Sequence, residues 1–505
     1  MDVNRKLISN TVYLFLDWFV LSLIGFLYWL IAGKTLLPEE YGILSTSINF
    51  AFILSGISFL GLNLTLMKLL PEYLSKKQNE KIVSLSRFSI KIVFLSNLVI
   101  ALFILLFSDY LANWIKVPIQ VVWISVLILF TTSFSGLFGT IIYGFQEMRK
   151  FFISDFFGQV VKIVTSLLLI FLGFRYFGPL LAFLLAFLLA TIIRLKFSYP
   201  YFSCQVKETI EWKKIMFDYA FPAFASFLAW ILFLNGQYVL LTILKNPQIT
   251  GIFTVAMIPT SIVTTFPSVL NTALFPLISF LSSDKNSKKR QNYLIQLVFR
   301  YALFLSLPVA AILVIFSKQV ILIFSTSKYL EASTLFPILT FGALTYGLGN
   351  IFHSSLYAIG KTKVHRNIVF LTTLSFITLA IPLASQFAGF GMALSYTLSV
   401  TLFTILSFFQ IKRFLKLKLP LINSLKCILA LLISISFFYL ITKLTTNLLI
   451  EIFSTIIAGL IYLWTLALTK FYIKEDVRIL EIFANKSPLF GKQILFLAKL
   501  LSKYI

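Results

Sequence analysis

A stripe of polar side chains runs along one otherwise apolar stretch of the chain. Asp155, Gln159, Lys162 and Ser166 recur at intervals of four, three and four residues, which places them on one face of a helix. Lys162 stands about ten residues into that stretch, so a rise of about 1.5 Å per residue would bring it near mid-bilayer. Cations at that depth are costly and often mark a transport pathway. The stripe predicts either a cavity that binds an anion or a polar contact between helices.

The composition indicates that this helix lies in a membrane. Of the 505 residues, 59% are apolar and only 12% are charged, whereas soluble domains average about 25% charged residues. This excludes a soluble enzyme, a disordered protein and a secreted module held by disulfides. The net charge of +25 is explained by the bias of Lys and Arg toward cytoplasmic loops, so we expect no nucleic-acid partner.

Fourteen apolar segments are long enough to cross a bilayer, which takes about 20 residues per helix. They fall at 10–31, 43–67, 88–108, 120–144, 152–174, 176–193, 215–243, 249–281, 295–317, 333–359, 367–387, 390–411, 421–442 and 449–469. The sequence therefore predicts an all-α polytopic membrane protein with about 14 transmembrane helices.

The distribution of cations predicts the orientation. With a cytoplasmic N-terminus, the inside segments hold 32 Lys and Arg, the outside loops hold seven, and four lie within spans. We therefore expect a multi-pass protein of the cell (cytoplasmic) membrane with both termini in the cytoplasm. Residues 488–505 place three lysines opposite an apolar helical face. This tail is expected to lie on the inner leaflet and bind anionic lipids, or to serve a regulatory partner.

Short matches suggest that the chain repeats itself. "YGILSTSINF" is answered by "TGIFTVAMIP", so that Gly42 and Gly251 stand 209 residues apart. "FGPLLAFLLAF" with Gly178 is answered by "FGMALSYTLSV" with Gly391. The period of roughly 209–214 residues corresponds to six spans, and an even number keeps both copies in the same orientation. Such parallel repeats build several alternating-access carriers.

Four motifs, in this order, resemble the polysaccharide and O-antigen flippases, a branch of the superfamily that includes the multidrug and toxin extrusion (MATE) exporters. They are "LLPEEYGILS" (36–45), "LTLMKLLPEY" (64–73), "ITGIFTVA" (249–256) and "LNTALFPLIS" (270–279). The resemblance implies an N-lobe at 1–205, a C-lobe at 206–418, a terminal helix pair at 419–470 and a cytoplasmic amphipathic tail at 471–505. Each lobe would contain six helices.

The resemblance also implies a function. Such a protein would carry a polyprenyl-(di)phosphate-linked oligosaccharide from the inner to the outer leaflet by alternating access, for the synthesis of surface polysaccharide. A polysaccharide polymerase or glycosyltransferases would be natural partners. The chain departs from the family at "GKTLLPEE", where Lys34 and Leu37 replace the usual Arg and Gly. The acid that many relatives carry late in the seventh span is also replaced, by Gly236 and Gln237, so the resemblance carries no ion-coupling role to that helix.

Further residues could line a wet, cationic cavity. Lys68 matches a family position, and Arg300 lies about five residues into the ninth span, where it could also snorkel to the interface. Asp17 could pair with a cation or bind a coupling ion, while His365 is expected in a cytoplasmic loop. Amide and imidazole groups suit sugar hydrogen bonding and equally suit helix contacts. These candidates are Asn235, Gln237, Asn271, Asn350 and His353.

Other functional classes find less support. The outside loops hold scattered acids without a paired-carboxylate motif, so we expect no catalytic residues. "AIGKTK" lacks the upstream glycine of a nucleotide-binding loop because Ser355 stands there. No Cys/His spacing suits a metal, and no cofactor is expected. A MATE-like, cation-coupled exporter of small molecules remains the alternative, although its cavity should be acidic or aromatic.

Overall fold

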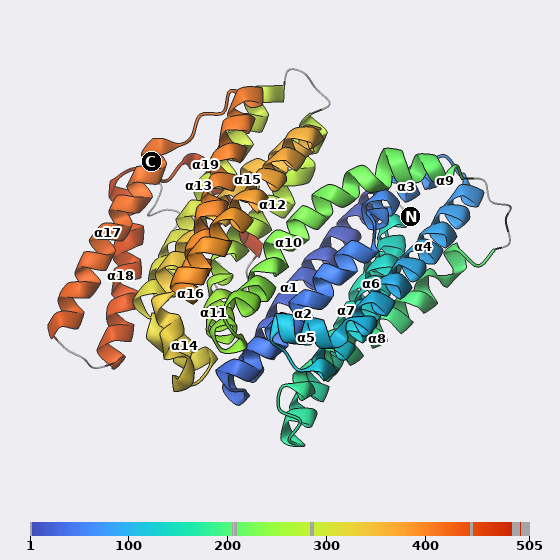
Figure 1. Cartoon of the computed structure of the whole chain (residues 1–505). Helices are drawn as coiled ribbons and strands as arrows, with labels where there is room; N and C mark the ends of the chain where they lie inside the picture. The colour runs from blue at the N-terminus through green and yellow to red at the C-terminus, as the bar shows by residue number, and fades with distance from the viewer. Residues whose placement is uncertain are drawn as a thin grey trace. The chain divides into compact units, whose positions relative to one another are not determined.

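The computed structural model describes residues 3–204, 206, 210–282, 287–444, 448–486 and 495, and within these the regular structure is entirely helical (Figure 1). Ten of these helices are long and apolar enough to cross a membrane, or eleven if the bent pair η4–α15 counts as one span. This confirms the predicted all-α polytopic fold. The basic segment 488–505 lies outside the described residues, apart from position 495.

The helices are, in chain order, α1 Val3–Thr35, α2 Pro38–Ser58, α3 Leu62–Ser75, α4 Asn79–Leu106, α5 Ser108–Ile115, α6 Ile119–Gly144, α7 Met148–Phe171, α8 Phe177–Ser198, η1 Tyr199–Tyr201, α9 Trp212–Lys214, η2 Ile215–Ala220, α10 Phe221–Leu244, α11 Pro247–Thr260, α12 Ile262–Leu281, α13 Lys288–Ile315, α14 Ser317–Phe324, η4 Ser327–Thr334, α15 Phe336–Ala358, α16 Thr362–Leu415, α17 Leu421–Leu444, α18 Leu448–Leu468 and α19 Lys474–Lys486.

Each of the fourteen apolar segments overlaps a helix, but two expected single spans are divided. Segment 43–67 breaks between α2 and α3, where Gly61 has a φ of 81° and a Cβ there would lie 2.1 Å from the Ala220 carbonyl oxygen. Segment 249–281 breaks at Ser261 between α11 and α12, two residues after Pro259. Glycine supports a left-handed turn and proline interrupts the helical hydrogen bonds, so both breaks have local causes.

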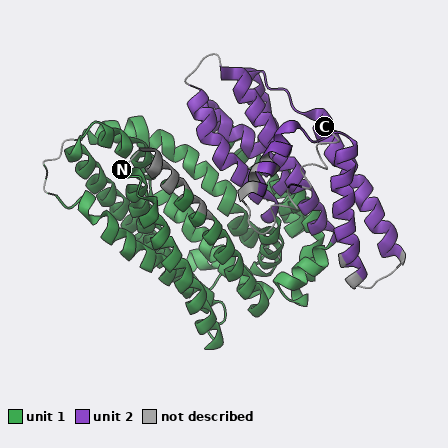
Figure 2. Ribbon diagram, turned by 180° about the vertical axis from the view of Figure 1, so that it is seen from behind, with its two compact units in different colours: residues 1–261, 316–342, 366–403 green, residues 262–315, 343–365, 404–505 purple. Residues whose placement is uncertain are grey.

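The chain forms two compact units, coloured separately in Figure 2. Unit 1 comprises residues 1–261, 316–342 and 366–403, and unit 2 comprises residues 262–315, 343–365 and 404–505. In unit 1, α7 packs against α1 and α8, and α2 packs against α6, α10 and α11. In unit 2, α13 packs against α12 and α17, and α17 packs against α18. The division into lobes at residue 205 stays a prediction.

Helices α2 and α11 meet backbone to backbone. A Cβ added to Gly42 would lie 1.7 Å from the carbonyl oxygen of Pro247, and one added to Gly251 would lie 1.9 Å from that of Pro38. Each glycine therefore contacts the proline at the start of the other helix. The two prolines, like the two glycines, are 209 residues apart and so occupy equivalent positions of the repeat. Three residues further along both helices, the Ser45 and Thr254 hydroxyls lie 3.0 Å apart. The 209-residue repeat thus corresponds to a symmetric helix crossing.

The second pair of repeat glycines forms two equivalent corners. A Cβ at Gly178, at the start of α8, would lie 3.1 Å from the backbone nitrogen of Ile170. A Cβ at Gly391 would lie 1.9 Å from the carbonyl oxygen of Leu383, beside Ala388, whose backbone (φ 50°, ψ −129°) interrupts the 54-residue α16. Both corners separate two predicted spans, 152–174 from 176–193 and 367–387 from 390–411.

We predict that Gly42→Ala destabilises the protein, because its methyl group would overlap the Pro247 carbonyl in a contact between two backbones. Overpacking of this kind costs about 1–3 kcal/mol or more. Thermal unfolding of the purified protein in detergent should show a lower melting temperature. Gly25→Ala is the matched control, because no atom lies within 4 Å of its added Cβ. Equal melting temperatures for the two variants would contradict the tight crossing.

Candidate functional site

Four buried or largely buried charged side chains from α1, α7 and α8 form a charge cluster: Asp17, Asp155, Lys162 and Arg194. These three helices pack together in unit 1 (Figure 1). Arg194 is 5% exposed, and its Nη2 lies 2.5 Å from Oδ1 of Asp155. Its Nε donates to the Ser154 hydroxyl at 2.9 Å, and its Nη1 donates to the Ser135 hydroxyl at 2.8 Å. The guanidinium is therefore satisfied on every nitrogen and holds α6, α7 and α8 together.

The two carboxyl groups of the charge cluster face each other. Asp17 on α1 and Asp155 on α7 lie close enough to act on each other's charge, and the charge of Arg194 acts on both carboxyl groups. Oδ1 of Asp17 is buried without a partner among the described residues. One guanidinium thus serves two adjacent acids, so a proton or a second cation is needed to balance their charge.

Lys162, the other cation of the cluster, lies against a wall of aromatic rings. It is 6% exposed, and its Nζ lies 4.9 Å from the ring centroid of Tyr28 and 5.9 Å from that of Phe183. Tyr28 is itself held by a 2.9 Å hydrogen bond to the Pro179 carbonyl oxygen. No described carboxylate lies within 4.0 Å of the ammonium, although Asp155 lies close enough to act on its charge. Lys162 is therefore the cation of the cluster that can still accept an anionic partner.

The polar stripe of α7 keeps further unused hydrogen-bonding capacity. The Gln159 Oε1 and the Ser166 hydroxyl are buried and have no partner among the described residues. Buried polar atoms are normally paired with protein or water. Together with Lys162, they offer an acceptor, a hydroxyl and a cation along one face of one helix, a set of groups that could bind a hydrated or anionic ligand.

Sequence reasoning missed Arg194 because hydropathy ended the sixth span at residue 193. The structure continues α8 to Ser198, so that Arg194 lies inside the packed helix rather than in a loop. A signal was present: Ala182, Ala186 and Ala190 precede Arg194 at intervals of four residues and are all buried. Such a row of small residues is typical of a helix-packing face, and Arg194 continues it.

In unit 2, the structure brings several predicted polar residues together in pairs. The Ser354 hydroxyl on α15 donates to Oδ1 of Asn271 on α12 at 2.5 Å. His353, which is 5% exposed, stacks on His365 with 3.8 Å between ring centroids. His365 belongs to the first turns of α16 and not to a solvated loop, which corrects the sequence expectation. Asn350 is half-buried one turn before Ser354.

Arg300 has a partner that its surrounding sequence did not suggest. It is 4% exposed, and its Nη2 lies 2.5 Å from Oδ1 of Asp476, at the start of α19. Its Nη1 donates to the Phe471 carbonyl oxygen at 3.3 Å, and the Tyr301 hydroxyl also donates to Asp476. Arg300 therefore fastens α19 to α13 and does not snorkel to a surface.

Three other predicted residues make local contacts. The exposed Lys68 places its Nζ 4.7 Å from the ring centroid of Tyr219. Asn235 and Gln237 donate to carbonyl oxygens of their own helix, α10, at 3.1 and 2.9 Å. Oε1 of Gln237 is buried and unpaired among the described residues. Among all the residues that the structure describes, no group of three or more His, Cys, Asp or Glu could hold a metal ion.

Comparison with known proteins assigns the chain to a family. The profile described as "Polysaccharide biosynthesis protein" matches residues 7–282, which is more than half of the chain. The chain belongs to this family. A second profile, MatE, matches residues 222–385. The resemblance read from the four motifs is thereby confirmed.

Individual relatives are distant but cover most of the chain. An uncharacterized membrane protein of Methanocaldococcus jannaschii is 23% identical over 424 residues, which span 78% of this chain and 82% of that protein. The structure of the lipid II flippase MurJ in an inward closed conformation matches with a TM-score of 0.71 and 18% identity, covering 91% of this chain and 98% of its own. An inward-facing MATE family multidrug resistance transporter matches with a TM-score of 0.61 and 14% identity, covering 78% and 94%. Both structures have the same fold as this chain.

We predict that Arg194→Met strongly lowers the melting temperature in detergent, because it leaves Asp155 and Asp17 buried without their cation. Breaking a buried ion pair on one side costs about 3–5 kcal/mol. The double variant Arg194→Met/Asp155→Met should recover much of the loss, since it removes both charges. Lys196→Ala, an exposed cation on the same helix, is the control. If Arg194→Met melts like Lys196→Ala, the cluster does not hold these helices together.

Proposed function

We propose that this protein is a flippase that moves a polyprenyl-(di)phosphate-linked oligosaccharide from the inner to the outer leaflet. The observation that carries the proposal is Lys162, a buried cation on a membrane-length helix with no ion-pair partner among the described residues. Membership of the polysaccharide biosynthesis protein family and the fold shared with a lipid II flippase support the same conclusion. The similar solved structures are a flippase and a multidrug transporter, which argues against an enzyme.

The substrate class follows from the chemistry of the charge cluster. A lipid-linked oligosaccharide presents one or two phosphates beside a polar glycan, and these groups must be shielded from hydrocarbon as they cross. Lys162 would bind the phosphate, while Gln159 and Ser166 on the same face of α7 would bind the glycan or its water. Arg194 is already saturated, so its role is to keep Asp155 from neutralising Lys162.

Export needs no nucleotide in this scheme. With the cell interior negative, outward movement of an anionic headgroup is favoured by about 2.3 kcal/mol per charge per 100 mV. The Asp17–Asp155 pair offers a place where a proton or another coupling cation could bind, since one guanidinium cannot balance both acids. The proposal includes cytoplasmic termini, a cell-membrane location and a tail held by anionic lipids. A polymerase or glycosyltransferases would supply or consume the substrate.

Alternating access would require α2 and α11 to separate. Under the proposed orientation, the ends that carry Pro38 and Pro247 face outward, so the Gly42–Gly251 contact closes the outer side. Close glycine packing without an ion pair can form and separate without leaving a charge unpaired. Closing and opening of this contact as the two lobes rock would expose the headgroup site first inward and then outward.

A MATE-like exporter is the second candidate. It is favoured by the MatE match over residues 222–385 and by the two adjacent acids, Asp17 and Asp155, which could bind a small cation. The two candidates demand different things of Lys162: an anionic headgroup needs its charge, whereas a cationic drug is repelled by it.

We predict that the wild-type protein restores surface polysaccharide in a cell lacking its own lipid-linked oligosaccharide flippase, and that Lys162→Ala abolishes this rescue. Lys162→Arg should retain it, because a guanidinium preserves the charge. Surface polysaccharide is measured at matched membrane levels. The control is Lys91→Ala, which removes an exposed lysine from the spanning helix α4. Full rescue by Lys162→Ala would remove Lys162 from the pathway, and efflux of a cationic dye that increases in this variant would favour the exporter.

We further predict that a disulfide between Ser45→Cys and Thr254→Cys stops flipping, and that a reductant restores it. The native hydroxyls lie 3.0 Å apart across the α2–α11 crossing. The background carries Cys204→Ser and Cys427→Ala, and transport of a fluorescent polyprenyl-diphosphate sugar is measured in proteoliposomes. The control disulfide joins Ser55→Cys to Ser133→Cys, whose hydroxyls lie 3.1 Å apart within the predicted N-lobe. Undiminished flipping by the locked α2–α11 protein would contradict the proposed opening.

A further inference from the structure

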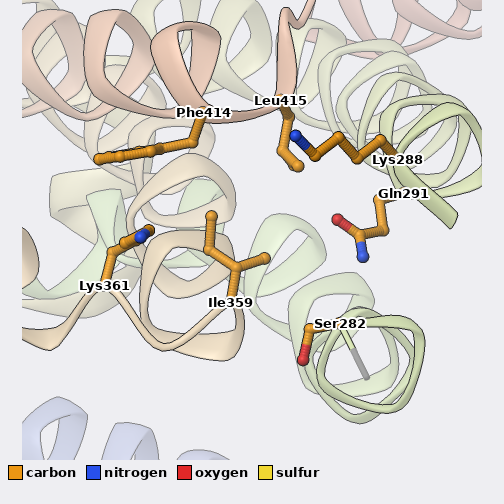
Figure 3. Close-up of a pocket in the computed structure, with 7 residues that line it drawn as sticks. All are labelled: Ser282, Lys288, Gln291, Ile359, Lys361, Phe414 and Leu415. Carbon is orange, nitrogen blue, oxygen red and sulfur yellow. The ribbon is translucent and has the colours of Figure 1, made fainter. Parts of the chain in front are cut away.

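A pocket of about 440 Å³ lies within unit 2, where the ends of several helices meet. Its wall comes from the end of α12, the start of α13, the turn between α15 and α16, and the end of α16. The seven lining residues are Ser282, Lys288, Gln291, Ile359, Lys361, Phe414 and Leu415 (Figure 3). None of them belongs to the charge cluster of unit 1, so the pocket is a separate feature of the molecule.

Two lysines give the pocket its charge. Figure 3 shows Lys288 extending beside Leu415, and Lys361 below the ring of Phe414. The Nζ of Lys361 lies 4.8 Å from the centroid of that ring, a cation–π contact that orients the side chain. Lys288 is the first residue of α13, and Lys361 is the N-cap of α16. The positive ends of two helix dipoles therefore add to the two ammonium charges.

The chain around the pocket is also predominantly positively charged. The described segments that line it, 287–294, 360–366 and 412–418, contain ten Lys and Arg and no acid, and the nearest acid in the sequence before them is Asp284. Asp284 lies outside the described residues. In the described part of the chain, no salt bridge involves Lys288 or Lys361. The pocket therefore attracts an anion and contains no described carboxylate that would compete with it.

The remaining lining residues indicate which other chemical groups an anionic ligand should have. The Gln291 side chain, 3% exposed, projects into the pocket and donates to the Ser287 hydroxyl at 2.9 Å. Its carbonyl oxygen is an acceptor that could receive a hydrogen bond from a ligand hydroxyl. Ile359, Phe414 and Leu415 form an apolar wall. The start of α13 and the end of α16 are joined by a 2.6 Å hydrogen bond from the Asn292 amide to the Leu415 carbonyl oxygen.

We propose that this pocket binds a phosphate ester that carries hydroxyl groups, and that the ligand is the headgroup of an anionic glycerophospholipid. Lys288 and Lys361 would hold the phosphate, Gln291 and Ser282 would hold the headgroup hydroxyls, and the apolar wall would receive the glycerol and the first methylenes. The site goes beyond the proposed flipping activity, because its ligand is a lipid of the surrounding bilayer and not the transported molecule.

Two observations favour a lipid over a soluble phosphate ester. The pocket lies at the ends of membrane-length helices, and large apolar side chains one turn before its lining residues are exposed. Phe280, just before Ser282, is 79% exposed, and Tyr357, four residues before Lys361, is 51% exposed. Acyl chains could therefore lie against α12 and α15 while the headgroup occupies the pocket. A soluble ligand would make no use of this apolar rim.

Native mass spectrometry of the purified full chain with added phosphatidylglycerol or phosphatidylcholine tests the proposal. The wild type should retain phosphatidylglycerol in preference, and Lys288→Gln/Lys361→Gln should weaken that binding roughly tenfold, as expected for two lost cation–phosphate contacts. The control Lys289→Gln/Lys363→Gln removes the same charge from exposed neighbours outside the pocket and should leave the preference nearly unchanged. Melting temperatures of both variants confirm folding.

Two results would overturn the inference. Equal retention of the two lipids by the wild type, or equal losses in the pocket and control variants, would mean that only diffuse charge attracts lipid to this face. A competition arm with soluble glycerol phosphate separates the two sources of the ligand. If it displaces phosphatidylglycerol at similar concentrations, the lipid assignment is wrong and the pocket belongs to a soluble phosphate ester.

Discussion

The contact between the backbones of α2 and α11 is the constraint on which much of unit 1 depends. Gly42 and Gly251 leave no room for even one carbon between these helices, and dispersion rather than hydrophobic burial holds helices together in a bilayer. Close approach then brings matching hydroxyls together at Ser45 and Thr254. Positions 209 residues apart in the repeat thus place the same small residue on each helix where the two cross. The repeat in the sequence therefore corresponds to the symmetry of the helix crossing.

The charge cluster on the neighbouring helices has a different physical cause. In a low-dielectric interior, Asp17 and Asp155 could not remain adjacent without a nearby cation. Arg194 meets that need with three well-placed contacts and is thereby fully occupied. Lys162 stands against aromatic rings instead, so its charge is only partly offset. This asymmetry separates a cation that supports the structure from one that remains available to a ligand.

The sequence predicted what local pattern controls and missed what distant packing decides. The apolar segments, the glycine repeats and the α7 stripe from Asp155 to Ser166 follow from periodicity along single helices. Arg194 was assigned to a loop because hydropathy cannot tell a packed arginine at a helix end from a solvated one. The partner of Arg300, Asp476, lies 176 residues away. No local pattern links these two residues, so only the folded chain could pair them.

The two anion sites proposed here differ in whether a carboxylate lies near the lysines. The reason is that one ligand must be released and the other need not be. A transported headgroup would have to leave again, so its binding must be limited, and the Asp155 carboxylate near Lys162 would weaken the attraction to a phosphate there. A lipid of the bilayer need not leave. The pocket around Lys288 and Lys361 accordingly has no described carboxylate in its lining and adds two helix N-termini to its cations. On this reasoning, Asp155 would serve the proposed transport as much as Lys162 does, because it would keep the site from holding its substrate too tightly to release it.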